Sequence, residues 1–309
     1  MSLSPLPLQA IGPADVFTFL VQYADAFALL FLAAIGLAII FGIMGVINLA
    51  HGELIMVGSF TTTLTYEAGL PLLVAMISGV VVTTVFGVIL ERLFIQHLYG
   101  RLVDSMVATF GLGLIISQGA RIVFGNSLPQ IGTPFGSLSY GVYSFSTYRV
   151  LLAGISLLIG ATVYLLFTRT KWGIRARATI QNEAMARSLG TDTERMYVLT
   201  FALGSALAGL TGALYAPTQT QVPLLGREFL FESFVTVVVS GASVLSGVLL
   251  AAGVLGVVQT IFAYLFGTVM GQLAMLCTAI LLLRFLPDGM SGAYQSLQGR
   301  MQGMWGGEE

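Results

Sequence analysis

Charged residues are scarce in this 309-residue chain, in which 9% of residues are charged, 56% are apolar and the mean hydropathy is +0.92. Soluble globular domains carry about 25% charged residues. The 13 basic and 14 acidic side chains of this chain cannot cover a water-facing surface of its size. The formal net charge of −1 also leaves no basic face for nucleic acid. The composition therefore excludes a soluble protein and predicts one whose surface is covered by lipid.

Residues that carry common enzyme chemistry are also few. The two histidines and the single cysteine, Cys277, do not form a zinc site by themselves, and no H-E-x-x-H or G-x-S-x-G pattern is present. The only lysine, Lys171, lacks the preceding glycine and the following hydroxyl of a Walker A loop. We therefore expect no enzyme activity and no cofactor. If transport is driven by ATP, the ATPase must be another polypeptide.

Long stretches without charged residues organise the chain. A membrane-spanning helix needs about 20 mostly apolar residues. The longest charge-free interval, 233–283, has 51 residues, and a single helix of that length would measure about 77 Å, which corresponds to two spans and a turn. In all we expect about eight transmembrane helices in an all-α polytopic integral membrane protein. The other candidate spans are residues 26–52, 53–66, 68–90, 105–120, 150–168 and 196–226.

The membrane domain is expected to cover residues 26–290. The stretch 1–25 contains three prolines and lacks the basic region of a cleaved signal peptide, so we interpret it as an N-terminal tail or an interfacial segment. Residues 291–309 are the expected C-terminal tail. The segment 122–148 is free of charge but rich in glycine, proline, serine and tyrosine, which predicts an ordered loop outside the bilayer.

Basic residues predict the orientation in the membrane. Six of the 13 basic residues lie within 169–195, and loops rich in lysine and arginine face the cytoplasm. Counting spans from this loop places 122–148 outside and Arg92 and Arg101 inside, and it agrees with an external N-terminus. The side of the C-terminus depends on how 233–283 divides into spans, which the sequence leaves open.

The densest polar group in an apolar setting lies between Gly42 and Glu53. Three glycines loosen the helix there, and Asn48, His51 and Glu53 supply donors and acceptors near the freed backbone. Broken helices of this kind line solute paths in transporters. Three interpretations stay open: a substrate path or gate, a proton relay, or close packing with His51 and Glu53 at the end of a span.

A second interrupted helix is expected near 232–247. Glu232 precedes a run of valines and then a cluster of serine and glycine between Ser240 and Gly247. This pattern favours a half-length helix, and Glu232 joins the candidate residues of the substrate path or gate. The alternative is an ordinary helix end followed by a serine-rich turn.

The basic loop 169–195 has a soluble-like composition and predicts a short helix from Asn182 to Gly190. Met185 and Leu189 are apolar neighbours one turn apart on this helix. A helix this short is unstable alone. It is either a handle that docks into the groove of a partner protein or a linker that lies on the lipid headgroups.

The span after this loop carries a small residue at every fourth position. These residues are Gly204, Ala208 and Gly212. Small residues at this spacing let two helix backbones approach closely in a membrane. We therefore expect this face to pack against another helix.

Together these segments resemble the permease subunits of bacterial ABC importers of the branched-chain amino-acid and urea type (LivH/UrtB-like). The resemblance covers about residues 28–290. It departs from the family pattern at Ser240-Gly241, where a Gly-Gly pair is common, and at Leu286 to Met290. The matching motifs are G-V-I-N-L-A-H-G-E at 45–53 with Met56 and Gly58, Q-N-x-x-M-A at 181–186 with Gly190, T-F-A-L-G at 200–204 with Ala208, Gly209 and Gly212, and E-S-F at 232–234 ahead of Gly241.

The resemblance implies a multi-pass subunit of the bacterial inner membrane with several partners. These partners are a second homologous permease, two cytoplasmic ATP-binding subunits and a periplasmic substrate-binding protein. It also makes the short helix in the basic loop the element that couples to the ATPase. The loop departs from the family's E-A-A…G pattern, since Met185 replaces the second alanine and Gly190 falls one place late. The implied coupling residues are Asn182, Glu183, Ala184, Met185, Ala186 and Gly190.

The substrate expected from the resemblance is urea or a short-chain amide, in preference to a branched-chain amino acid. The motif at 181–186, Tyr99-Gly100-Arg101 and Asp104 resemble the urea and amide branch more than the leucine branch. Selection in such importers lies mostly with the binding protein. The alternative function is an ion-coupled secondary transporter or channel that uses His51 and Glu53. An intramembrane enzyme lacks a nucleophile–base pair in this sequence.

Overall fold

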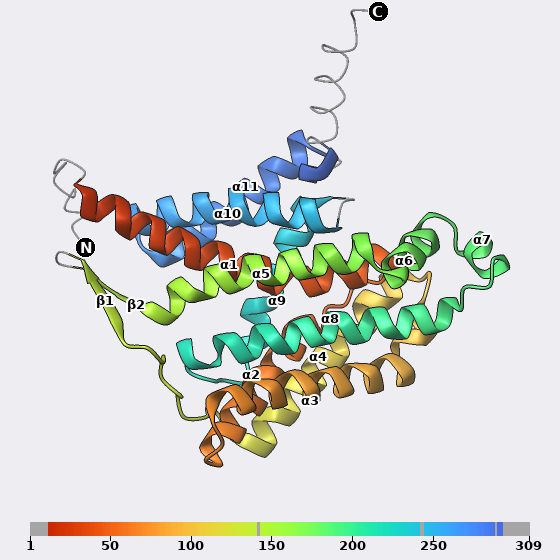
Figure 1. Ribbon diagram of the computed structural model, residues 1–309, viewed down its shortest axis with the longest axis horizontal. Helices are drawn as coiled ribbons and strands as arrows, with labels where there is room; N and C mark the ends of the chain where they lie inside the picture. Colours follow the sequence, from red (N-terminus) through yellow and green to blue (C-terminus); the bar gives the residue numbers. More distant parts are fainter. Residues whose placement is uncertain (1–11, 141–142, 242–243, 288, 293–309) are drawn as a thin grey trace, which may run out of the picture.

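The computed structural model describes residues 12–140, 143–241, 244–287 and 289–292, and Figure 1 shows their arrangement. Apart from one two-stranded hairpin, the described elements are helices. In chain order the elements are α1 (Pro13–Met44), α2 (His51–Glu67), α3 (Leu72–Leu93), η1 (Ile95–Leu98), α4 (Leu102–Phe124), β1 (Ser137–Tyr140), β2 (Tyr143–Ser146), α5 (Thr147–Arg169), α6 (Lys171–Gln181), α7 (Glu183–Ser188), α8 (Thr193–Tyr215), η2 (Ala216–Thr218), α9 (Leu225–Ser240), α10 (Val244–Phe266) and α11 (Thr268–Phe285).

Within the described residues, seven helices are long and apolar enough to cross a membrane: α1, α3, α4, α5, α8, α10 and α11. Two further helices are shorter than these spans: α2 has 17 residues and α9 has 16. The interval 233–283 holds the end of α9 followed by α10 and α11. The predicted class, an all-α polytopic membrane protein with about eight spans, is confirmed.

Helix α1 begins earlier than expected. Residues 13–25 belong to α1, although 1–25 were predicted to form an N-terminal tail or an interfacial segment. The helix starts at Gly12, whose backbone N–H donates to the carboxylate of Asp15 at 2.9 Å. The charge of Asp25 marked the expected boundary, but this carboxylate forms an ion pair with Arg149 at 2.7 Å and the helix continues past it. Residues 1–11 of the expected tail lie outside the described residues, as do 293–309 at the other end.

Helices α1 and α8 form the centre of the molecule. The most apolar 18-residue window of α1 is 78% buried and that of α8 is 67% buried, against 22% for α3 and α5. The backbones of the two central helices meet at Gly36 and Gly204, where a Cβ atom on Gly36 would lie 2.7 Å from the carbonyl oxygen of Gly204. The outer helices expose apolar side chains such as Leu73, Val107 and Ile280. This distribution is that of a protein whose outer surface faces lipid or another apolar subunit.

The two ends of the molecule differ. In the segment 122–148, β1 and β2 form an antiparallel hairpin in which Ser137 pairs with Ser146 and Tyr140 with Tyr143. Helices α6 and α7 lie at the opposite end (Figure 1). Helix α8 starts beside α7 and has 23 residues, so the ends are separated by at least the ~35 Å length of that helix.

Helix α9 is the half-length helix predicted near 232–247. The chain between η2 and α9 turns back into the protein, where the fully buried side chain of Gln221 accepts a hydrogen bond from Ser59 on α2. Helix α9 then packs against α1, α2 and α10, between α10 and α2 in Figure 1. It ends at Gly241, whose φ is +76°. Residues 242–243 of the predicted serine and glycine cluster lie outside the described residues.

Candidate functional site

The chain leaves the helical conformation between α1 and α2, within the predicted break at 42–53. Helix α1 ends at Gly45, where φ is +63°, and α2 starts at His51. Side chains satisfy the freed backbone groups, as burial requires. The Oδ1 atom of Asn48 accepts from the N–H of Ala50 at 3.0 Å, and the hydroxyl of Thr109 on α4 accepts from the N–H of Leu49 at 2.9 Å.

His51 and Glu53 are buried at the start of α2, with exposed fractions of 0% and 3%. The Nε2 atom of His51 lies 3.2 Å from the carbonyl oxygen of Ala33 on α1. Because a carbonyl only accepts, Nε2 is the protonated ring nitrogen. Glycines let neighbouring helices approach: a Cβ atom on Gly52 would lie 1.8 Å from the carbonyl oxygen of Gly226, and one on Gly113 would lie 3.2 Å from Oε2 of Glu53.

This buried cluster of Asn48, His51 and Glu53 has unused hydrogen-bonding capacity. The Nδ2 atom of Asn48, the Nδ1 atom of His51 and the Oε2 atom of Glu53 have no hydrogen-bond partner among the described residues. A buried polar atom without a partner costs about 1–3 kcal/mol. Native proteins keep such atoms where they serve a function or bind water. The cluster can therefore offer two acceptors and a donor to a polar solute.

Glu232, the fourth residue predicted to line the path or gate, lies apart from this cluster. It lines a cavity of about 440 Å³ on the other side of α9. On α9, Gly226 packs against Gly52, whereas Phe229 and Glu232 line the cavity. Helix α9 therefore separates two polar regions. The cavity also contains the Asp25–Arg149 ion pair, which no local pattern predicts because the two residues lie 124 positions apart in the chain.

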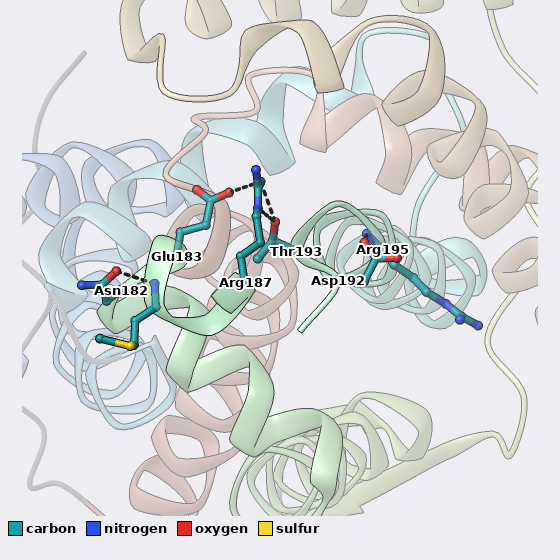
Figure 2. Close-up of polar contacts among 7 residues, drawn as sticks. Asn182, Glu183, Arg187, Asp192, Thr193 and Arg195 are labelled. Carbon is teal, nitrogen blue, oxygen red and sulfur yellow. Dashed lines mark hydrogen bonds and ion pairs between the residues drawn. The ribbon is translucent and has the colours of Figure 1, made fainter. Parts of the chain in front are cut away.

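The predicted short helix in the basic loop is α7, and side chains cap it (Figure 2). The Oδ1 atom of Asn182 accepts from the N–H of Met185 at 2.9 Å, which is the N-cap geometry. Arg187 forms an ion pair with Glu183 at 2.9 Å and donates to the hydroxyl of Thr193, the first residue of α8, also at 2.9 Å. These contacts fix α7 relative to the start of α8.

The end of α7 is a Schellman motif around Gly190. The N–H of Gly190 donates to the carbonyl of Arg187 and the N–H of Thr191 to that of Ala186, both at 3.0 Å. Gly190 has a φ of +84°, a left-handed conformation that costs about 1–2 kcal/mol for other residues. The loop then enters α8 through Asp192, whose Oδ1 atom accepts from the N–H of Arg195 at 3.0 Å. The turn therefore requires glycine at position 190 for its backbone conformation.

Helix α7 presents apolar side chains to solvent. Met185 is 57% exposed and Leu189 is 78% exposed, whereas Ala186 is 3% exposed. Glu183 and Ala184 are also exposed. The side that a partner can contact is therefore formed by Met185 and Leu189. Ala186 faces the protein, so added bulk at that position would disturb the loop rather than the contact.

The three small residues of α8 lie at helix contacts. A Cβ atom on Gly204 would lie 2.5 Å from Cγ1 of Ile40 on α1, and one on Gly212 would lie 2.0 Å from the carbonyl oxygen of Ile55 on α2. Ala208, between them, is 1% exposed. Gly209, a motif residue outside the predicted small-residue face, meets Thr83 of α3, where a Cβ atom would lie 2.7 Å from the Cβ of Thr83.

Seven long apolar helices among the described residues, a broken helix with buried polar groups and a cap-stabilised loop helix at one end together describe a multi-pass membrane protein.

Comparison with known proteins then gives the family. Residues 19–286 match the family described as branched-chain amino acid transport system / permease component, and the chain belongs to this family. It is 28% identical over 279 residues to the high-affinity branched-chain amino acid transport system permease protein BraD of Pseudomonas aeruginosa, covering 84% of this chain and 91% of that protein. It is 31% identical over 288 residues to the probable branched-chain amino acid transport permease protein LivH of Methanocaldococcus jannaschii. This match covers 85% of this chain and 89% of that protein.

A shorter match, 28% identical over 147 residues, joins 46% of this chain to 42% of the probable branched-chain amino acid transport permease protein LivM of Methanocaldococcus jannaschii. The chain is therefore a permease subunit rather than an enzyme. It is a multi-pass protein of the inner membrane.

Proposed function

We propose that this chain and a second, homologous permease form the solute path of a binding-protein-dependent ABC importer. Two cytoplasmic ATP-binding subunits drive it and a periplasmic binding protein delivers the solute. The family match over residues 19–286 carries this proposal. The similarity of this chain to both LivH and LivM supports a pair of related permeases around one path. No observation among the described residues favours an ion-coupled transporter or channel instead.

The proposed substrate is a branched-chain amino acid. The relatives BraD and LivH are named for branched-chain amino acid transport. The expected preference for urea or a short-chain amide rested on short motifs near Tyr99 and at 181–186, and the family match does not support it. In proteoliposomes that contain the complete complex, unlabelled isoleucine and valine should compete with labelled leucine for uptake, whereas urea and acetamide should not. Competition by urea alone would restore the amide preference.

In this proposal α7 faces the cytoplasm and docks on an ATP-binding subunit, and the β1–β2 hairpin faces outside. The six basic residues between Arg169 and Arg195 support this orientation. With α10 and α11 as two antiparallel spans after α9, the end of α11 lies on the side of α7. This division supports a cytoplasmic C-terminus.

Cysteine labelling tests the orientation. In a Cys277→Ser background, a cysteine at Ser188 should react with a membrane-impermeant thiol reagent only in inside-out vesicles, and one at Ser137 only in right-side-out vesicles. Both positions are exposed, so access to the reagent depends on sidedness alone. The reversed pattern would overturn the orientation.

The buried cluster of Asn48, His51 and Glu53 is proposed to line or gate the path by hydrogen bonding. Glu53→Gln keeps an acceptor at the position of the unpartnered oxygen, whereas Glu53→Ala removes it. Uptake should therefore stay within about threefold of wild type in Glu53→Gln and fall about tenfold or more in Glu53→Ala. A proton relay predicts equal losses in both variants. Uptake at matched complex levels between pH 5.5 and 8.5 distinguishes the two.

A further inference from the structure

The cavity beside α9 collects polar groups from five parts of the chain. Its walls come from α1, the start of α5, the segment before α9, α9 itself, and the paired helices α10 and α11. We call this cavity of about 440 Å³ the α9 chamber. Arg149 directly follows the β1–β2 hairpin and Thr268 opens α11, so the chamber lies toward the hairpin end of the molecule. This is the end opposite to α7 (Figure 1).

The described lining of the chamber holds three acidic residues and one basic residue. Asp25 and Arg149 neutralise each other through their ion pair at 2.7 Å. Glu228 and Glu232 also line the chamber, and no basic residue lies within ion-pair distance of either of them among the described residues. They are four residues apart on α9, a spacing that places both on one face of the helix. The chamber thus presents two carboxyl groups in addition to the Asp25–Arg149 pair.

Further polar atoms in the chamber lack partners. Thr260 is 3% exposed, and its buried hydroxyl has no hydrogen-bond partner in the part of the chain that the structure describes. The same holds for the buried Oε1 atom of the neighbouring Gln259. Both residues line the chamber beside apolar side chains of Leu29 and Phe229. Buried polar atoms that the fold leaves unpaired at a cavity wall are available to a bound molecule.

We infer that the α9 chamber binds an amino-acid zwitterion through its ammonium group. Glu228 and Glu232 accept hydrogen bonds from the ammonium group. Arg149 binds the carboxylate of the amino acid through N–H donors that its ion pair with Asp25 does not use. Leu29 and Phe229 contact the aliphatic side chain. The inference rests on the proposed function, since it places a binding step for the proposed substrate inside a single permease subunit. A guanidinium has five donors, so one ion pair leaves donors free.

The two acidic side chains of α9 distinguish an amino acid from a neutral amide. Urea and acetamide carry no charge and supply no cationic partner to Glu228 and Glu232. An ammonium group supplies that partner and three donors. The chamber is also a separate place from the buried cluster at Asn48, because α9 lies between the two. In this inference the solute is held in the α9 chamber before it reaches the buried cluster on the other side of α9.

A protection experiment tests binding without the periplasmic protein. In a Cys277→Ser complex, a cysteine replaces Thr268, an exposed residue at the chamber wall, and its reaction with a thiol reagent is timed. Leucine and 3-methylbutylamine, which has the ammonium group alone, should slow the reaction. The carboxylate 4-methylpentanoate and urea should not. Protection by 4-methylpentanoate or urea equal to that by leucine, or no protection up to the solubility limit of leucine, would overturn the inference.

Variants of the two carboxylates supply the matched test. Glu228→Gln and Glu232→Gln should each abolish protection and lower ATP-driven leucine uptake about tenfold or more. Glu67→Gln, at an exposed glutamate outside the chamber, should leave both unchanged. Glu228 is itself exposed, so its variant should fold even if Glu232→Gln does not. If the wild-type complex takes up leucine and the Glu228→Gln and Glu232→Gln variants take it up equally well, the chamber is refuted and the proposed function stands. Absence of leucine uptake by the wild-type complex would refute the proposed function itself.

Discussion

Replacing Gly212 by alanine should remove most of the folded protein. The added Cβ atom would lie 2.0 Å from the carbonyl oxygen of Ile55 and 2.7 Å from the backbone nitrogen of Ser59. Both are backbone atoms of α2, so no side chain can turn away to make room. Helix α8 must then move away from α2. Overpacking of this kind typically costs about 1–3 kcal/mol, and a clash with backbone lies at the upper end of that range.

The matched control is Gly154→Ala on α5. Gly154 is also inside a long helix, but no atom lies within 4 Å of the position of its Cβ. Alanine favours a helix over glycine by up to about 1 kcal/mol, so this variant should be as stable as wild type or more stable. The effect of each variant is measured by the size-exclusion yield and the unfolding temperature of the detergent-solubilised chain. Equal behaviour of the two variants would contradict the close packing of α8 on α2.

Replacing Leu189 or Met185 by aspartate should abolish ATP-driven uptake while the permease still folds. The two side chains are 78% and 57% exposed, so a charge there disturbs little inside the subunit. In the proposed complex they form the apolar contact of α7 with an ATP-binding subunit, and truncated anchors of such interfaces cost 2 kcal/mol or more. We expect at least about a 30-fold loss of uptake at unchanged permease yield.

Leu70→Asp is the control for this prediction. Leu70 is 45% exposed, lies between α2 and α3, and is remote from α7 in the chain. Uptake by this variant should match wild type. Pull-down of the ATP-binding subunits by each tagged permease variant measures the contact directly. Full uptake and full pull-down by Leu189→Asp would show that α7 does not carry the coupling.

The sequence predicted the parts of the fold that depend on local pattern. Charge-free runs located the spans because a charge at bilayer depth is costly. The short helix α7 followed from Asn182 as its N-cap and Gly190 as its end, and both positions have the expected geometry. The break before His51 followed from glycines among polar residues, and the helix is interrupted there.

Features that depend on distant parts of the chain were not predictable in this way. The start of α1 was misplaced because Asp25 finds its partner at Arg149, 124 residues later in the chain. Glu53 and Glu232 were both predicted to line the path, and the structure places them on different sides of α9. A local pattern gives neither the partner of a charge nor the side of a helix that faces a cavity.

The most direct test of the central claim is the energy source of uptake. The complete complex is reconstituted in liposomes with the binding protein on the side of the β1–β2 hairpin, and labelled leucine is supplied there. We predict that uptake requires ATP on the side of α7 and continues after ionophores have collapsed all ion gradients. Uptake by this chain alone, driven by a proton or sodium gradient without ATP, would contradict the account.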